Sequence, residues 1–247
     1  MKVLITRPRH QSEAFGAALQ AAGFEPVYFP VIEIRPLEDN TALDRALGKI
    51  GCYDWLIFTS VNGVEMVRSR PPFRLPLPES LRVAAIGPKT ASALREIGIQ
   101  PFFVPEEYVA EAILPGLGDL RGRWVLLPRA EIARKALPEA IARSGGVAHE
   151  IAVYRTLPSA VDAQGLVAIA SGVDVLTFTS PSTVQNFAEI IRREGLDPLS
   201  LPGNPRVACI GPITQKAARD EGFRVDIVAA EYTTEGLIEA LSKQVAG

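Results

Sequence analysis

Short apolar runs alternate along the chain with stretches in which apolar residues recur at helical spacing. The runs are rich in β-branched and aromatic residues, which is typical of buried strands, and helical patterns cover residues 12–22, 61–68 and 89–97. Strands that alternate with helices predict β-α-β units and a parallel sheet covered on both faces. The predicted strands are residues 3–6, 25–29, 55–58, 83–86, 102–104, 124–127, 147–153, 175–178, 207–210 and 225–228.

The second half of the chain repeats the first. Phe58-Thr59-Ser60 recurs as Phe178-Thr179-Ser180, and residues 84–90 recur as residues 208–214; the offsets, by subtraction of residue numbers, are 120 and 124. Four matches in one order predict a duplicated domain of about 120 residues, not a solenoid. The other two matches pair residues 3–7 with 125–129, and Val104, Glu107, Tyr108 and Glu111 with Val228, Glu231, Tyr232 and Glu235.

Two segments interrupt the alternation at the same place in each repeat. Residues 31–36 and 152–158 both read as extended, and each ends at a proline, which disfavours helix in the residue before it. They are predicted to pair as a two-stranded linker, with two ordinary loops as the alternative. The simplest domain boundary lies near residue 120, and a division at the two linkers is its rival.

Composition limits the kinds of partner. With 26 Lys and Arg against 28 Asp and Glu, the net charge is −2, which argues against nucleic-acid binding through bulk charge. No apolar run reaches the roughly 18 residues of a membrane span. Two cysteines, Cys52 and Cys209, exclude a disulfide framework and a cysteine-rich metal site. We expect a cytoplasmic protein with no membrane or nucleic-acid partner, and a monomer because no coiled-coil pattern is visible.

The candidate chemistry lies at the carboxyl ends of the predicted strands, where doubly wound sheets bind their ligands. Most residues there are Ser, Thr or Gly at strand-to-helix turns, whose free N–H groups bind anions. Three cations, Arg7, Lys89 and Arg129, lie at the same strand ends, where each can meet a carboxylate or phosphate. The paired turns predict a polyanionic ligand, whereas each residue taken alone reads as a helix cap. The candidates for substrate binding are Arg7, Thr59, Ser60, Gly87, Lys89, Thr90, Arg129, Thr179, Ser180, Ser182, Gly211 and Thr214.

Few residues are suited to acid–base work. Tyr154 lies in a predicted linker, and its phenol can donate a proton; the alternative is a tyrosine packed between the domains. Tyr108 and Tyr232, before the last helix of each half, are predicted packing residues. The only histidines, His10 and His149, lack metal-ligand spacing.

Taken together, these segments resemble the uroporphyrinogen-III synthase family over essentially the whole chain. No single segment is diagnostic, but their order and spacing together are fairly specific. The segments are Leu4-Ile5-Thr6-Arg7-Pro8, Phe58-Thr59-Ser60, Ile86-Gly87-Pro88-Lys89-Thr90, Val153-Tyr154-Arg155-Thr156, Phe178-Thr179-Ser180-Pro181-Ser182 and Tyr232-Thr233-Thr234-Glu235-Gly236-Leu237.

For the fold, the resemblance implies two similar three-layer α/β/α domains with five-stranded parallel sheets. The domains are swapped, because the first strand–helix–strand of one half completes the sheet of the other, and a two-stranded linker joins them. This replaces the boundary near residue 120. The implied domains are residues 1–34 with 158–247, and residues 37–152, with linkers near 31–36 and 152–158.

For the function, the resemblance implies an enzyme that takes hydroxymethylbilane, a linear tetrapyrrole with eight carboxylates, and binds it in an interdomain cleft. It removes the hydroxyl, inverts ring D and closes the macrocycle as uroporphyrinogen III, with no metal or organic cofactor. Tyr154 is the implied proton donor, Thr90 matches a threonine implicated in the family, and Thr233 or Thr234 matches another. The implied partners are the small-molecule substrate and, transiently, the enzyme that produces it.

Two other functions remain open from the residues alone. The duplication and cleft also suit a two-lobed small-molecule sensor that binds without turnover. Residues 87–90 resemble the end of a phosphate-binding loop, which suggests a phosphate-handling α/β enzyme, although the upstream glycine and adjacent Gly-Lys pair are absent.

Overall fold

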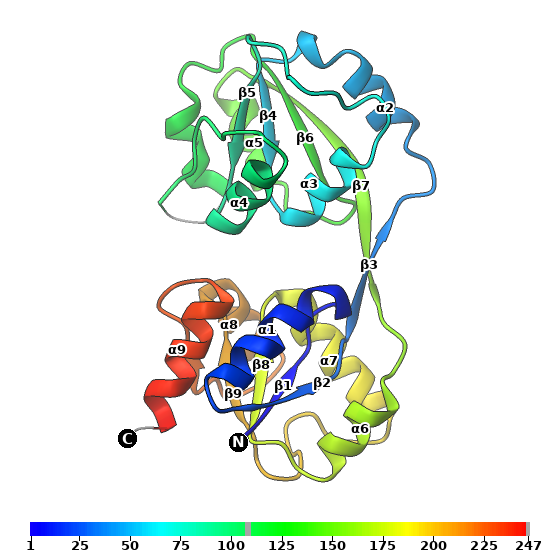
Figure 1. The fold of residues 1–247 in the computed structure, drawn as a ribbon, viewed down its shortest axis with the longest axis vertical. Helices are drawn as coiled ribbons and strands as arrows, with labels where there is room; N and C mark the ends of the chain where they lie inside the picture. Colours follow the sequence, from blue (N-terminus) through cyan, green and yellow to red (C-terminus); the bar gives the residue numbers. More distant parts are fainter. Residues whose placement is uncertain (107–109, 246–247) are drawn as a thin grey trace. The chain divides into compact units, whose positions relative to one another are not determined.

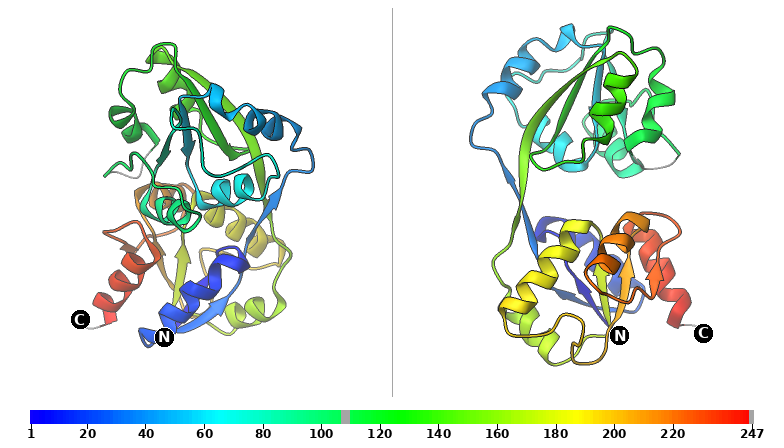
Figure 2. Two further views of the ribbon diagram at one scale, coloured as in Figure 1. Left: turned by 45° about the horizontal axis from the view of Figure 1, so that its top comes forward. Right: turned by 180° about the vertical axis from the view of Figure 1, so that it is seen from behind.

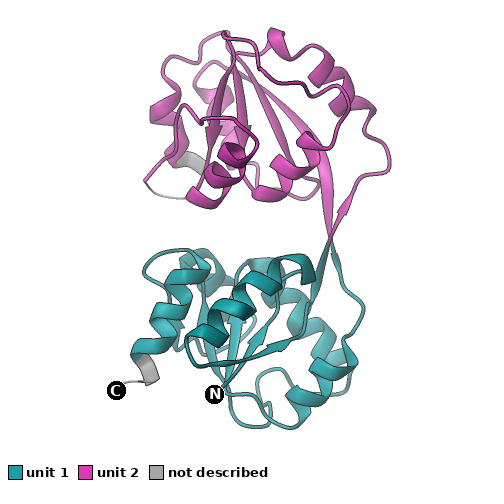
Figure 3. Cartoon of the chain, viewed as in Figure 1, with its two compact units in different colours: residues 1–33, 157–247 teal, residues 34–156 magenta. Residues whose placement is uncertain are grey.

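The computed structural model describes residues 1–106 and 110–245. The chain forms two compact units (Figure 3). Unit 1 comprises Met1–Glu33 and Leu157–Gly247, and unit 2 comprises Ile34–Thr156. The chain therefore passes from one unit to the other twice, within the predicted linkers. The boundary near residue 120 is wrong, because that residue lies well inside unit 2.

Unit 1 is a five-stranded parallel sheet with helices on both faces (Figures 1 and 2). The strand order is β10-β9-β8-β1-β2, so the first strand–helix–strand of the chain completes a sheet begun by the C-terminal half. Helices α1 and α9 pack on one face, and α6, α7 and α8 on the other. The strands are β1 (Lys2–Ile5), β2 (Glu25–Tyr28), β8 (Val175–Phe178), β9 (Arg206–Cys209) and β10 (Ile227–Val228). The helices are α1 (Arg9–Ala21), α6 (Ala163–Ala170), α7 (Pro181–Arg193), α8 (Pro212–Asp220) and α9 (Thr234–Val245).

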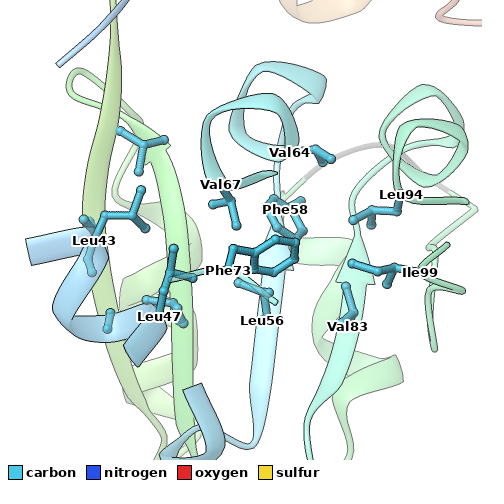
Figure 4. Packing of buried hydrophobic residues seen from close by; sticks show 14 of the residues in the cluster. Leu43, Leu47, Leu56, Phe58, Val64, Val67, Phe73, Val83, Leu94 and Ile99 are labelled. Carbon is cyan, nitrogen blue, oxygen red and sulfur yellow. The ribbon is translucent and has the colours of Figure 1, made fainter. Parts of the chain in front are cut away.

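Unit 2 has the strand order β3-β7-β6-β4-β5, in which β4, β5, β6 and β7 are parallel and β3 lies at the edge beside β7. Helices α2, α3 and α4 cover one face through an apolar core that includes the fully buried Phe58 (Figure 4), and α5 and η2 cover the other. The strands are β3 (Ile32–Pro36), β4 (Trp55–Phe58), β5 (Arg82–Ala85), β6 (Trp124–Ala130) and β7 (Val147–Pro158). The helices are α2 (Thr41–Gly48), η1 (Ile50–Cys52), α3 (Val61–Arg68), α4 (Pro88–Glu96), η2 (Ala110–Leu117) and α5 (Ala136–Arg143).

The predicted duplicated, swapped fold is confirmed, with two differences in unit 2. The strand predicted at residues 102–104 is only an isolated bridge between Phe103 and Ala84. Pro101 and Pro105 flank that run and lack the N–H groups that a longer ladder needs. The fifth strand is instead β3, from the predicted linker, and it lies beside β7. The strand expected at 147–153 and the linker expected at 152–158 form one continuous element, β7.

In each sheet an aspartate just before one inner strand accepts a hydrogen bond from the neighbouring strand. The Oδ2 of Asp54, just before β4, accepts a hydrogen bond of 2.8 Å from the N–H of Trp124 on β6. Asp174, just before β8, accepts one of 2.5 Å from the N–H of Lys2 on β1. The two aspartates occupy equivalent places in the repeat, so both sheets join their two central strands in the same way.

The two cysteines have different surroundings. Cys209 is fully buried in β9, and burial raises the pKa of its thiol to about 12, so it is a packing group and not a reactive thiolate. Cys52 is exposed. Within the described residues, the helices are all too short or too polar to cross a bilayer.

Candidate functional site

In each unit the predicted residues lie where strands end and helices begin. In unit 2, Ser60 follows β4 and is the N-cap of α3, where its Oγ accepts a hydrogen bond of 3.1 Å from the N–H of Gly63. Gly87 follows β5 and is the N-cap of α4, with Pro88 in the first helical turn. In unit 1, Ser180 and Gly211 hold the equivalent places before α7 and α8. Each unit therefore presents helix N-termini at the carboxyl edge of its own sheet.

Tyr154 owes its orientation to a β-bulge in β7. The register against β6 slips at this point, so that Ala130 pairs with Tyr154 and Val153 is the extra residue. Because side chains alternate along a strand, a regular β7 would place Val153 and Tyr154 on opposite faces. Both instead pack into the same core, together with Ile151. The bulge therefore turns the phenol toward the face that α3 covers.

There the phenol meets the cap of α3. The Oη of Tyr154 lies 3.1 Å from the Oγ of Ser60, and either hydroxyl can be the donor. The Tyr154 side chain is only 7% exposed, and its ring is packed in the apolar core of that face. Gly63 is what lets α3 come so close, since a Cβ there would lie 3.1 Å from the Pro128 carbonyl oxygen of β6. The arrangement is a hydroxyl pair with a helix N-terminus behind it.

The predicted cation Arg129 is not part of this cluster. Strand alternation places it with Val125 and Leu127 on the opposite face of the unit 2 sheet. There its guanidinium donates to the carboxylate of Glu150 (3.1 Å) and to the carbonyl of Arg134 (2.7 Å). Arg129 is 6% exposed, so its charge is largely paired within unit 2.

Arg7 occupies the equivalent position after β1 in unit 1. Its Nη2 donates to Gln11 at 3.0 Å. Burial lowers the pKa of its guanidinium, and the nearby carboxylate of Glu235 opposes that shift. In residues 1–106 and 112–243, the buried side-chain nitrogens without a hydrogen-bond partner are the Nε atoms of Arg7 and Arg129.

The threonine candidates differ in accessibility. Thr90, Thr214 and Thr234 are buried, at 6%, 3% and 5% exposure. Thr234 donates to the carboxylate of Glu235 (3.0 Å). Thr233 is half-buried, and its Oγ1 accepts from the N–H of Gly236 (3.0 Å) at the start of α9. Of the pair that the sequence left undecided, Thr233 is therefore the more accessible.

The remaining candidates are surface or half-buried groups. Lys89 is exposed in the first turn of α4. Thr59 and Thr179 are half-buried, and Ser182 Oγ contacts Ser180 Oγ at 2.9 Å. The partly exposed ring of Tyr232 covers Gly211, since a Cβ there would lie 3.1 Å from Cδ1 of the ring. Tyr108 lies outside the described residues.

Sequence reasoning missed the acidic partners of both arginines. Glu150 lies on β7, directly before Ile151, and Glu235 lies in the first turn of α9. The strand period of two around Arg129 and Glu150 is visible in the sequence, but their pairing depends on the register of β6 against β7. The repeat match of Glu235 with Glu111 was the one available signal.

Fold and site together define a duplicated α/β protein with a phenol–serine pair at the carboxyl edge of one sheet. A family model described as uroporphyrinogen-III synthase HemD matches residues 13–239. A uroporphyrinogen-III synthase of Synechococcus elongatus is 31% identical over 98% of this chain and 94% of its own length, and one of Chlorobaculum parvum is 30% identical over 98% of both. The chain belongs to the uroporphyrinogen-III synthase family, and so to the enzymes of porphyrin biosynthesis that act on a small tetrapyrrole.

Solved structures agree on the fold. A mutant uroporphyrinogen III synthase of Thermus thermophilus superimposes with a TM-score of 0.67 at 24% identity, covering 100% of this chain and 99% of its own. The enzyme of Helicobacter pylori gives a TM-score of 0.61 at 19% identity, covering 99% and 98%. The comparisons lend no support to the alternative of a small-molecule sensor.

Proposed function

We propose that this protein converts hydroxymethylbilane to uroporphyrinogen III by dehydration, inversion of ring D and ring closure, and that it is a carbon–oxygen lyase. Family membership supports the reaction. The observation that carries the assignment of chemistry is the contact between Tyr154 Oη and Ser60 Oγ, because it holds a proton donor at the carboxyl edge of a parallel sheet, where such folds bind ligands.

Tyr154 supplies the proton for the first step. The phenol protonates the terminal hydroxyl of the substrate, the C–O bond breaks, and water leaves with the bonding electrons. The pyrrole nitrogen donates electrons to the terminal carbon that has lost water. Loss of the pyrrole N–H proton, which can return to the phenolate, then gives a neutral azafulvene. The substituted carbon of ring D attacks the terminal carbon of the azafulvene, from which water has left, to form a spiro intermediate. General acid catalysis of this kind contributes about 100- to 10,000-fold.

The second task is to hold one conformation of the substrate. Closure without the enzyme gives the uninverted isomer, so the enzyme must favour the attack that inverts ring D. Helix N-termini at Ser60, Gly87, Ser180 and Gly211 supply N–H groups for the substrate carboxylates. We keep Arg7, Lys89 and Thr233 as carboxylate-binding candidates. For Thr90, Thr214, Thr234 and Arg129, which are buried or paired, direct binding requires local movement, and the equally buried Tyr154 requires it to reach the substrate hydroxyl.

The test is the identity of the product. Purified protein incubated with freshly generated hydroxymethylbilane should yield the III isomer, measured by chromatography after oxidation to the porphyrin. A control incubation without protein yields the I isomer. A product composition the same as that of the control would overturn the proposed function.

Replacing Tyr154 by Phe tests the proton donor. The ring is retained and one hydrogen bond is lost, so we expect a free energy of unfolding within about 1.5 kcal/mol of the wild type. We expect kcat to fall by about 100-fold or more, with the I isomer accumulating as spontaneous closure competes. Unchanged kcat would remove Tyr154 from this role.

Partners and location are also proposed. The unstable product of the preceding step favours a transient contact with the enzyme that makes it, and no nucleic acid or membrane takes part. A higher share of III isomer when both enzymes share one vessel than when the same substrate is added in bulk would support that contact; an equal share would contradict it.

The cytoplasmic location stays a prediction, to be checked by cell fractionation.

A further inference from the structure

Ser60 has two roles that a single hydroxyl can fill at once. A serine hydroxyl has one proton and two acceptor lone pairs. One lone pair accepts the N–H of Gly63 in the first turn of α3, at 3.1 Å, and on the other side lies Tyr154 Oη, also at 3.1 Å. The hydroxyl of Ser60 can therefore donate a hydrogen bond to the phenol oxygen while its own oxygen still caps the helix.

We propose that Ser60 is a positioning residue for Tyr154, and not a substrate-binding residue: its hydroxyl donates a hydrogen bond to the phenol oxygen as Tyr154 gives its proton to the substrate. This inference rests on the proposed function. Before proton transfer either hydroxyl can donate. After transfer the phenolate has no proton left, so Ser60 is the donor in the pair. The Gly63 N–H and the N-terminus of the eight-residue α3 polarise the serine in the required direction.

The duplicated half lacks this pair. Ser180 caps α7 in the same way, accepting from the N–H of Thr183 at 3.2 Å, but its Oγ contacts Ser182 Oγ at 2.9 Å. At the offset of 122 that relates residues 3–7 to 125–129, Ile32 stands where Tyr154 stands. Duplication therefore kept the cap in both units, whereas the phenol belongs to unit 2. An ordinary cap explains Ser180, and the contact with Tyr154 is what Ser60 adds.

The experiment compares three variants in the full-length protein. Ser60→Gly removes the hydroxyl but keeps a residue that caps helices almost as well. Ser60→Thr keeps the hydroxyl. Asp162→Gly is the matched control, because Asp162 caps α6, also eight residues long, by accepting from the N–H of Gly165 at 2.9 Å, and it belongs to unit 1 whereas the phenol belongs to unit 2. Thermal unfolding of each variant reports the cost of the cap separately from the rate.

We expect Ser60→Gly to lower kcat by about 10- to 100-fold with little change in KM, the effect of removing one hydrogen bond to a charged group. Ser60→Thr should restore kcat, and Asp162→Gly should leave it unchanged. In a Tyr154→Phe background, Ser60→Gly should cause no further loss, because the serine acts through the phenol.

Two results would overturn the inference. One is Ser60→Gly with wild-type kcat, or with a raised KM alone, which would make Ser60 a substrate contact. The other is a Ser60→Gly, Tyr154→Phe double variant whose loss of kcat equals the product of the two single losses. That result would show that Ser60 acts independently of Tyr154. Either result, obtained while the wild type still makes the III isomer, leaves the proposed function standing. A wild type that makes only the I isomer overturns the proposed function itself.

Discussion

At the scale of single residues, the direction of a hydroxyl proton separates Thr233 from Thr234. Thr234 is buried, and its proton is directed at the carboxylate of Glu235. Thr233 is half-buried, and its oxygen accepts from Gly236, so its proton remains available for a substrate carboxylate. Adjacent residues of the same type thus have different chemistry, which the sequence alone does not show.

We therefore expect Thr233→Gly to raise KM by about 10-fold, the usual worth of one hydrogen bond to a charged acceptor. Glycine retains most of the capping preference at the start of α9, so the protein should remain folded. Thr234→Val replaces a buried hydroxyl by a methyl group of similar size. It should lower the melting temperature and leave KM close to that of the wild type. The reverse pattern in steady-state kinetics would assign the substrate contact to Thr234.

At the scale of elements, the aspartates before β4 and β8 each join two neighbouring strands. Partial burial tends to raise the pKa of Asp54, but hydrogen bonds from the N–H of Trp124 and from Arg123, together with the positive charge of Arg123, outweigh burial and hold that pKa below its ordinary value. A carboxylate whose pKa is lower in the folded state stabilises the fold above its unfolded pKa, near 4. That stabilisation is lost as the pH falls through the folded value.

Asp54→Asn should consequently lower the melting temperature at pH 7 and have a shrinking effect below about pH 4, where the carboxylate is protonated first in the unfolded chain and, at still lower pH, in the folded protein. Asp220→Asn is the control, since Asp220 forms an exposed pair with Lys216 one helical turn away and such pairs contribute little. Melting curves between pH 3 and pH 8 measure both. A constant difference between Asp54→Asn and wild type across that range would contradict the assignment.

The sequence predicts elements well where local signals and the repeat agree. The serine caps at Ser60 and Ser180 and the proline-led starts of α4 and α8 follow from residues close together in the chain. The pairing of β1 with β8, in contrast, joins residues far apart in the chain, and only the family resemblance implies it. The sequence predicts poorly what depends on register. The bulge that orients Tyr154 comes from pairing with β6, and no local residue pattern announces it.

At the scale of the whole molecule, each unit has its own pair of apolar cores. Phe58 and Phe178 are matched by the repeat and fully buried in different units. Each Phe→Ala change should cost about 3–5 kcal/mol of stability in its own unit. We expect denaturant unfolding monitored by hydrogen exchange to show loss of protection in unit 2 for Phe58→Ala and in unit 1 for Phe178→Ala. Equal loss in both units for either variant would mean that the units unfold as one.

The two crossings of the chain also set an order for biosynthesis. Strand β1 is synthesised long before its neighbour β8, although Val3 of β1 pairs with Val175 of β8. Unit 2, in contrast, is a single uninterrupted stretch of chain. We therefore expect unit 2 to fold before unit 1 during synthesis, the reverse of the usual order, in which N-terminal parts fold first. Residues 34–156 are complete while β1 and β2 still lack β8, β9 and β10, the other strands of their sheet.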